Sequence, residues 1–197
     1  MRKVSILWAL LLITSLSTFA QSKGKSRTGF IAGVNYSRQF QSVSGTTDFS
    51  DFKTGLLIGL VRDIPVGGVF VFQPGVQFNR MGGKTSAGTS KYSYLSIPTL
   101  FKANLSKKLG LVAGPQTSLL LSAKGVDNFN GETDLKDATK SLDLAALVGL
   151  DYSYGKNQSG MFGVRYQAAM NNIQKVSGAG NFLRNSGFHV YFGYRFK

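Results

Sequence analysis

The stretch that decides the fold is GFHVYFGYRF, residues 187–196, just before the last residue of the chain. Its side chains alternate between two faces. One face is apolar (Phe188, Val190, Phe192, Tyr194, Phe196) and the other is mostly small or polar (Gly187, His189, Tyr191, Gly193, Arg195). Because successive side chains of a β-strand point to opposite faces, this pattern predicts a strand with one apolar side. A tilted strand of about ten residues can cross a bilayer, so the stretch predicts a membrane-spanning strand.

Seven earlier segments show the same alternation, over residues 28–37, 52–62, 70–79, 94–104, 109–122, 141–153 and 162–171. Their connections alternate in length. Short turns at 63–68, 106–108 and 155–159 separate longer loops at 39–51, 82–90, 124–140 and 174–185. This arrangement predicts an all-β fold: an eight-stranded antiparallel up-and-down transmembrane barrel, with short periplasmic turns, longer outside loops and both mature termini in the periplasm.

Two prolines fall inside these segments, Pro74 and Pro98. Proline has no N–H to donate to a strand ladder, so it normally argues against a strand. The alternation continues on both sides of each proline. We therefore keep both strands and expect a local break in pairing or a β-bulge at each position.

The distribution of polar residues separates a membrane barrel from a soluble one. In a soluble barrel the packed interior is apolar and the outside is wet. Here one face of nearly every segment is purely apolar, and the other mixes glycine, amide, hydroxyl and charged residues. An eight-stranded barrel has an interior that side chains just fill, so we expect the mixed face inside. A soluble lipocalin-like ligand-binding barrel is the structural alternative, and it would fractionate without detergent.

The N-terminus has the features of an export signal. Arg2 and Lys3 precede an apolar run over residues 4–16, and small residues precede a cleavage site after Ala20. This is typical of a secretory signal peptide, and the run is shorter than the ~20 residues that a retained membrane anchor needs. We expect a signal peptide at 1–20, a flexible basic lead-in at 21–27 and the barrel at 28–197.

The composition of the chain limits the classes of partner and anchor that we expect. The chain has 197 residues, no cysteine and a formal net charge of +14. The absence of cysteine excludes a lipid anchor on that residue and a disulfide framework. Nucleic acid would suit the charge, but the basic positions are scattered and the chain carries an export signal. We expect outer-membrane lipid and lipopolysaccharide as neighbours, no nucleic acid, no cofactor and a monomer.

Charged residues on the mixed faces form a candidate site. Strand directions put Lys53, Asp143 and His189 in the outer half of the lumen. They put Lys102, Asp151, Arg165 and Arg195 in the inner half. Asp151 and Arg165 flank one turn on adjacent strands, close enough to pair. Because a buried charge without a partner costs several kcal/mol, we predict a lumen ion-pair network that plugs the barrel. A proton or ion pathway is the alternative.

His189 is the only histidine, the residue type whose ordinary pKa lies nearest neutrality. A lipid-modifying hydrolase would need a serine and an acid beside it. Asp143 and Ser118 or Ser141 share its face, but their spacing does not place them beside it. A lumen histidine without catalytic role is our interpretation, with the enzyme as the alternative. The acidic residues of the 124–140 loop do not match a calcium-binding loop, so we interpret that loop as solvated.

Four short motifs support a family resemblance: Tyr94-Leu95-Ser96-Ile97-Pro98, Gly114-Pro115, Arg165-Tyr166 and Gly193-Tyr194-Arg195-Phe196. With them the mature chain resembles the PorT-like outer-membrane β-barrel family, although Ser96 stands where that family usually has an acidic residue. The resemblance implies an outer-membrane location and, for some relatives, a part in secretion or gliding machinery. It transfers no catalytic residue.

The closing strand, with Phe188, Phe192, Tyr194 and Phe196, also resembles the strand that the barrel-insertion machinery reads. We therefore expect a non-enzymatic structural, binding or assembly module that acts through its outside loops or its periplasmic rim.

Overall fold

A computed structural model describes residues 25–43, 45–86, 88–127, 131–175 and 181–196. The predicted signal peptide at 1–20 lies outside the described residues, as does most of the predicted basic lead-in. The first strand begins at Arg27, the last residue of that lead-in. Within the described residues, no helix is long and apolar enough to cross a membrane.

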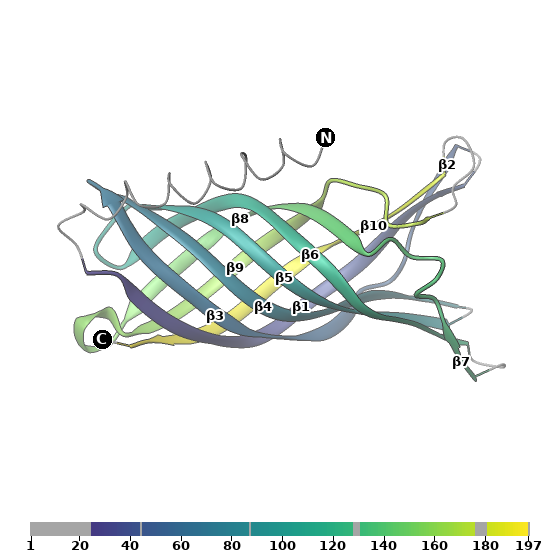
Figure 1. The fold of residues 1–197 in the computed structure, drawn as a ribbon, viewed down its shortest axis with the longest axis horizontal. Helices are drawn as coiled ribbons and strands as arrows, with labels where there is room; N and C mark the ends of the chain where they lie inside the picture. The colour runs from purple at the N-terminus through teal and green to yellow at the C-terminus, as the bar shows by residue number, and fades with distance from the viewer. Residues whose placement is uncertain (1–24, 44, 87, 128–130, 176–180, 197) are drawn as a thin grey trace, which may run out of the picture.

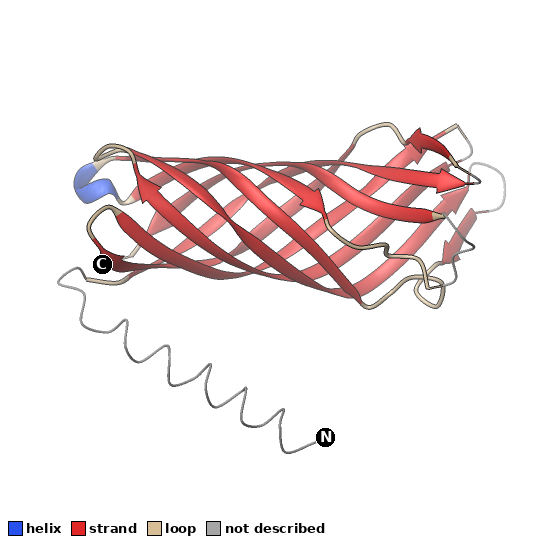
Figure 2. Cartoon of the chain, turned by 90° about the horizontal axis from the view of Figure 1, so that it is seen from above, coloured by secondary structure: helices blue, strands red, loops and turns tan. Residues whose placement is uncertain are grey.

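Eight long strands form a closed antiparallel barrel (Figures 1 and 2). They are β1 (Arg27–Val43), β3 (Lys53–Gly67), β4 (Phe70–Thr85), β5 (Gly88–Asn104), β6 (Leu109–Asp127), β8 (Leu142–Tyr154), β9 (Gly160–Ala169) and β10 (Phe182–Arg195). Each long strand pairs with the next in chain order, and β10 pairs with β1 to close the barrel. The predicted eight-stranded up-and-down barrel is therefore confirmed.

The two ends of the barrel differ. At one end lie the start of β1, the C-terminus and the short connections, one of which contains the 3₁₀ turn η2 (Lys156–Gln158) (Figure 1). We call this the terminal end. At the other end, two short strands extend the wall: β2 (Thr46–Phe49) pairs with β1, and β7 (Gly131–Asp134) pairs with β6. We call this the hairpin end.

The prediction of loops at the hairpin end was wrong in part. The β4–β5 ladder continues to Thr85 and Gly88, so the predicted 82–90 loop is a tight hairpin. Strands β2 and β7 occupy parts of the 39–51 and 124–140 loops, and β10 begins inside the 174–185 loop. Beyond the membrane a hairpin has no apolar face, so the alternation that identifies a strand is lost although the backbone pairing continues.

The side chains point as the alternation predicted. Phe192 and Leu144 are exposed on the outside, by 60% and 37%, whereas Arg165 and Asp151 are 2% and 1% exposed in the lumen. The outward apolar run covers Phe70–Phe78 on β4 and Leu95–Ala103 on β5. Tilted strands need about 9–11 residues to cross a bilayer, so these runs match a membrane-spanning band.

The ladder breaks beside both prolines without any change of register. Between β4 and β5, pairing stops after Pro74 and Thr99 and resumes at Gln77 and Ser96 in the same register. Pairing of β5 with β6 likewise skips two residues after Pro98. The expected breaks are thus confirmed, but the alternative of a bulge at these prolines is wrong. The register shifts lie elsewhere, at Pro65/Gly67 and Ser93/Tyr94.

Candidate functional site

An ion cluster centred on Asp63 fills the lumen near the terminal end. Lys102 Nζ lies 3.0 Å from Asp63 Oδ2, and Arg195 Nε lies 2.8 Å from the same oxygen. Gln73 Nε2 donates to the other carboxylate oxygen at 2.7 Å. The side chains of Lys102, Arg195 and Asp63 are 6%, 3% and 12% exposed. Both cations therefore depend on Asp63 to balance their charge.

Arg165 and Asp151 form a second pair next to this cluster. Arg165 Nη2 lies 3.2 Å from Asp151 Oδ1 and donates to Gln73 Oε1 at 2.7 Å. Gln73 Nε2 also lies 3.3 Å from Asp151 Oδ2. Tyr191 donates its hydroxyl hydrogen to Asp151, and its ring centroid lies 4.6 Å from the Arg165 guanidinium carbon. Gln73 thus joins the two ion pairs into one buried network.

A chain of amides and hydroxyls crosses the middle of the lumen. Gln77 Nε2 donates to Gln116 Oε1 at 2.9 Å, and Gln116 Nε2 donates to Gln167 Oε1 at 3.1 Å. The Ser96 and Ser118 hydroxyls are 2.9 Å apart. These contacts join strands β4, β5, β6 and β9 across the lumen. Because buried amides and hydroxyls are costly when unpaired, the chain also fixes these side chains in place.

An apolar cluster closes the lumen towards the hairpin end, formed by Met81, Tyr92, Tyr94, Leu120, Ala123 and Ile173. Ile173 comes from the segment between β9 and β10 and is fully buried. Tyr94 accepts a hydrogen bond from Asn185 Nδ2 at 3.1 Å. Side chains therefore occupy the lumen near both ends and in the middle.

Two predicted site residues, Asp143 and His189, are buried but stay outside the ion network. His189 Nε2 has no hydrogen-bond partner among the described residues, and the Asn185 side chain is the hydrogen-bonding neighbour of the Asp143 carboxylate. His189 lies opposite Arg165 and Asn35 in the strand ladders rather than opposite a serine. Ser118 is hydrogen-bonded to Ser96, and Ser141 is exposed. This geometry does not favour the hydrolase alternative.

Lys53, the remaining predicted site residue, forms no ion pair in the part of the chain that the structure describes. It is half-buried and lines a groove on the barrel wall with Arg80 and Lys91, which project outward. The β3–β4 ladder ends at Leu57, so Lys53 has no ladder partner on β4 in the described structure. Alternation alone assigns a face, but it does not predict where neighbouring strands separate.

Sequence reasoning missed Asp63 and Gln73, although both hold the network together. Asp63 was assigned to the turn before Pro65, where a carboxylate is normally solvated. Strand β3 in fact continues to Gly67, so Asp63 falls on the inward face. The sequence did contain a signal for Asp63. Side chains two residues apart on a strand share a face, so Asp63 should face inward as Val61 does.

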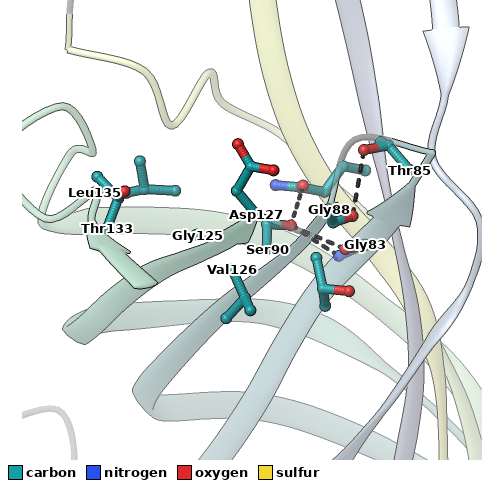
Figure 3. Close-up of a pocket in the computed structure, with 11 residues that line it drawn as sticks. Gly83, Thr85, Gly88, Ser90, Gly125, Val126, Asp127, Thr133 and Leu135 are labelled. Atoms are coloured by element: carbon teal, nitrogen blue, oxygen red, sulfur yellow. Dashed lines mark hydrogen bonds between the residues drawn. The ribbon is translucent and has the colours of Figure 1, made fainter. Parts of the chain in front are cut away.

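A shallow pocket of about 350 Å³ lies at the hairpin end, between the β4–β5 hairpin and the extended end of β6 with β7 (Figure 3). Ser90 donates to Gln39 Oε1 at 2.5 Å and accepts from the Gly83 N–H at 3.0 Å, which fixes one wall. Asp127 lies beside Ser90, and Thr133 and Leu135 lie on the opposite side (Figure 3). The pocket offers hydroxyl, amide and carboxylate groups to a partner.

The hairpin of β6 and β7 beside this pocket contains an ion pair between its two strands. Lys124 hydrogen-bonds Glu132, and this contact together with the lysine charge lowers the pKa of the Glu132 carboxyl. Among the described residues, no group of three or more histidine, cysteine, aspartate or glutamate side chains could hold a metal ion.

The fold is similar to solved outer-membrane barrels. Neisserial surface protein A aligns with a TM-score of 0.53 at 14% identity, over 85% of this chain and 97% of its own. The attachment invasion locus protein Ail of Yersinia pestis gives 0.49 at 14% identity, over 86% and 99%. OprG from Pseudomonas aeruginosa gives 0.41 at 10% identity, over 88% and 98%. No curated protein sequence matches this chain.

The family model described as "Outer membrane protein beta-barrel domain" matches residues 19–175. This match covers most of the chain, and it agrees with the closed barrel, the apolar outer band and the polar lumen. The chain therefore belongs to the outer membrane protein β-barrel domain family and is an integral protein of the bacterial outer membrane.

Proposed function

We propose that this protein is a closed, non-enzymatic barrel that serves as a binding or assembly module and acts through its hairpin end. One observation carries the proposal: the lumen is filled by the joined ion pairs of Asp63 and Asp151, each with its cations. An eight-stranded barrel has room for little more than side chains. Transport through the lumen is therefore disfavoured, and we expect binding or assembly to involve the exposed ends of the barrel.

We further propose that the hairpin end faces outward and that the terminal end, with both mature termini, faces the periplasm. Barrels of this type have short periplasmic turns and longer outside loops. Here the turn between β5 and β6 spans only Leu105–Lys108, whereas β2 and β7 lengthen the opposite end. Protease added to intact cells should then cleave at the hairpin end and spare the 105–108 turn.

The pocket of Figure 3 supports the choice of the hairpin end as the binding surface. Its walls are paired strands, and the Ser90 hydroxyl is held by Gln39 and Gly83. A pre-formed surface loses less conformational entropy on binding than a flexible loop does.

Photo-crosslinking in intact cells tests this proposal. A photoreactive residue at Thr133, exposed at the pocket rim, should give a discrete crosslinked protein. The matched position is Ser106, exposed in the terminal-end turn. Crosslinks from Ser106 alone would move the binding surface to the periplasmic rim. Large single-channel conductance of the purified protein in planar bilayers would refute the proposal that side chains plug the lumen.

The PorT-like subtype, and with it a role beside secretion or gliding machinery, also belongs to this proposal. We also propose that the protein is a monomer and that the barrel-insertion machinery recognises its closing strand. The outward aromatics of β10 support this step: Phe188, Phe192, Tyr194 and Phe196 are 44%, 60%, 56% and 49% exposed. Truncation before Tyr194 should then reduce the folded fraction in cells more than it does in detergent refolding.

A further inference from the structure

A groove of about 780 Å³ on the outer wall combines positive charge with an apolar floor. It lies at the hairpin-end limit of the β3–β4 ladder, which stops at Leu57 and Asn79. Its cations are Lys53, Arg80, Lys91 and Lys124, and none of its lining residues is acidic. The groove is separate from the ion network and from the pocket of Figure 3, but Met81 and Tyr92 of the apolar lumen cluster also line it.

The cations of this groove are crowded. Lys91 of β5 lies directly opposite Lys124 of β6 in the ladder. Like charges in that position are destabilising when nothing compensates them. The charges of Lys91, Arg80 and Lys84 also act on Lys53.

Internal carboxylates balance only part of this charge. Glu132 pairs with Lys124. In the part of the chain that the structure describes, no ion pair joins Lys53, Arg80 or Lys91 to a carboxylate. The groove is therefore suited to an external anion.

The floor of the groove is lined by lipid-facing apolar side chains. Val34, Leu56, Phe78 and Leu121 line it, and Val34, Leu56 and Leu121 are 47%, 46% and 42% exposed. Phe78 is the last apolar residue of the outward run on β4, and Arg80 is the next outward residue. The cations thus lie where the apolar band ends, at the depth of lipid headgroups.

We propose that this groove binds a phosphate-bearing lipid of the leaflet at the hairpin end. Phosphate groups of its headgroup would contact Arg80 and Lys91 with Lys53, and an acyl chain would lie along Leu56 and Phe78. Arginine binds phosphate through paired N–H donors, and lysine adds a point charge. A soluble anion would gain nothing from the apolar floor, and a neutral lipid would gain nothing from the cations.

Native mass spectrometry of the mature barrel in a neutral detergent tests this site. The probe is bis-phosphorylated lipid A, compared with the same lipid after removal of its phosphates and with inorganic phosphate. We expect an adduct with the phosphorylated lipid that weakens when ammonium acetate, the volatile salt of this measurement, is raised to 1 M, because salt screens exposed charges. An equal adduct with dephosphorylated lipid, or binding of inorganic phosphate alone, would overturn the proposal.

The variant Arg80→Ala/Lys91→Ala locates the site. A basic residue near a membrane surface contributes about 1 kcal/mol, so removing two should weaken binding roughly thirtyfold. Arg62→Ala is the matched control, since Arg62 is an exposed, outward cation of β3 at the opposite end of the band. Arg80→Lys/Lys91→Arg keeps both charges and should retain most of the binding.

The salt and phosphate comparisons on the wild-type protein keep the proposal testable if the double alanine variant does not fold. Undiminished binding by a folded double variant would refute the assignment to this groove. The choice of lipid A rests on the proposed outward orientation of the hairpin end, but the test is independent of the proposed binding role, because a crosslinking result at Thr133 leaves the lipid adduct unaffected.

Discussion

Replacing Asp63 by alanine tests the lumen network most severely. Asp63 is the one carboxylate within ion-pair distance of both Lys102 and Arg195 among the described residues, at 3.0 and 2.8 Å. At an effective dielectric constant of about 20, each of these contacts corresponds to roughly 5–6 kcal/mol of Coulomb attraction, from which the desolvation of the ions must be subtracted. Removing one partner of a buried pair typically costs about 3–5 kcal/mol, and here two cations lose theirs. We expect Asp63→Ala to lower the free energy of unfolding by at least that amount.

The assay is urea titration of the mature barrel in lipid vesicles, followed by circular dichroism or gel mobility. Tryptophan fluorescence is unsuitable, because the only tryptophan, Trp8, lies in the predicted signal peptide. Asp137→Ala, at an exposed position, is the control and should change stability by less than about 0.5 kcal/mol. Adding Lys102→Met to Asp63→Ala should recover part of the loss, since it removes one uncompensated charge. A single variant within about 1 kcal/mol of wild type would refute the reasoning.

Three further perturbations address the wall, the lipid face and the histidine. Gly55→Ala should block folding, because the added Cβ would lie 1.9 Å from the Arg80 carbonyl oxygen. The measurement is the folded fraction after detergent refolding. Gly125→Ala is the control and should be tolerated, because its Cβ would meet only a leucine side chain at 3.2 Å. Phe192→Lys should reduce stability in bilayers by about 2–4 kcal/mol, measured by urea titration in vesicles, since it places a charge on the lipid face. His189→Ala should leave lipid composition unchanged by mass spectrometry, and loss of a deacylated lipid in that variant would revive the hydrolase alternative.

Much of the barrel was predictable because a strand crossing a membrane carries a period-two signal in every residue. The outward position of Phe192 and the inward position of Arg165 both follow from parity alone. Pairing of Arg165 with Asp151 also follows, since the two residues flank one short turn. These inferences need only the strand direction and the turn length.

The remaining features depend on contacts between strands that are distant in sequence. Gln73 bridges Asp63 and Asp151 from β4, which no local pattern indicates. Ile173 closes the lumen from a segment without periodicity. Strands β2 and β7 are held by backbone pairing and have four residues each, with Phe49 as their single apolar side chain, so they carry no apolar alternation to detect.

The orientation of the strand faces is the claim on which the account depends, and adjacent spin labels on β8 test it directly. The chain has no cysteine, so Leu144→Cys and Ala145→Cys each give a single labelling site. Leu144 is 37% exposed on the outer wall, and Ala145 is 1% exposed in the lumen. In lipid vesicles, the label at 144 should collide freely with dissolved oxygen, while the label at 145 should be immobile and shielded from both oxygen and a water-soluble relaxation agent. Oxygen contact at 145 together with shielding at 144 would contradict the account.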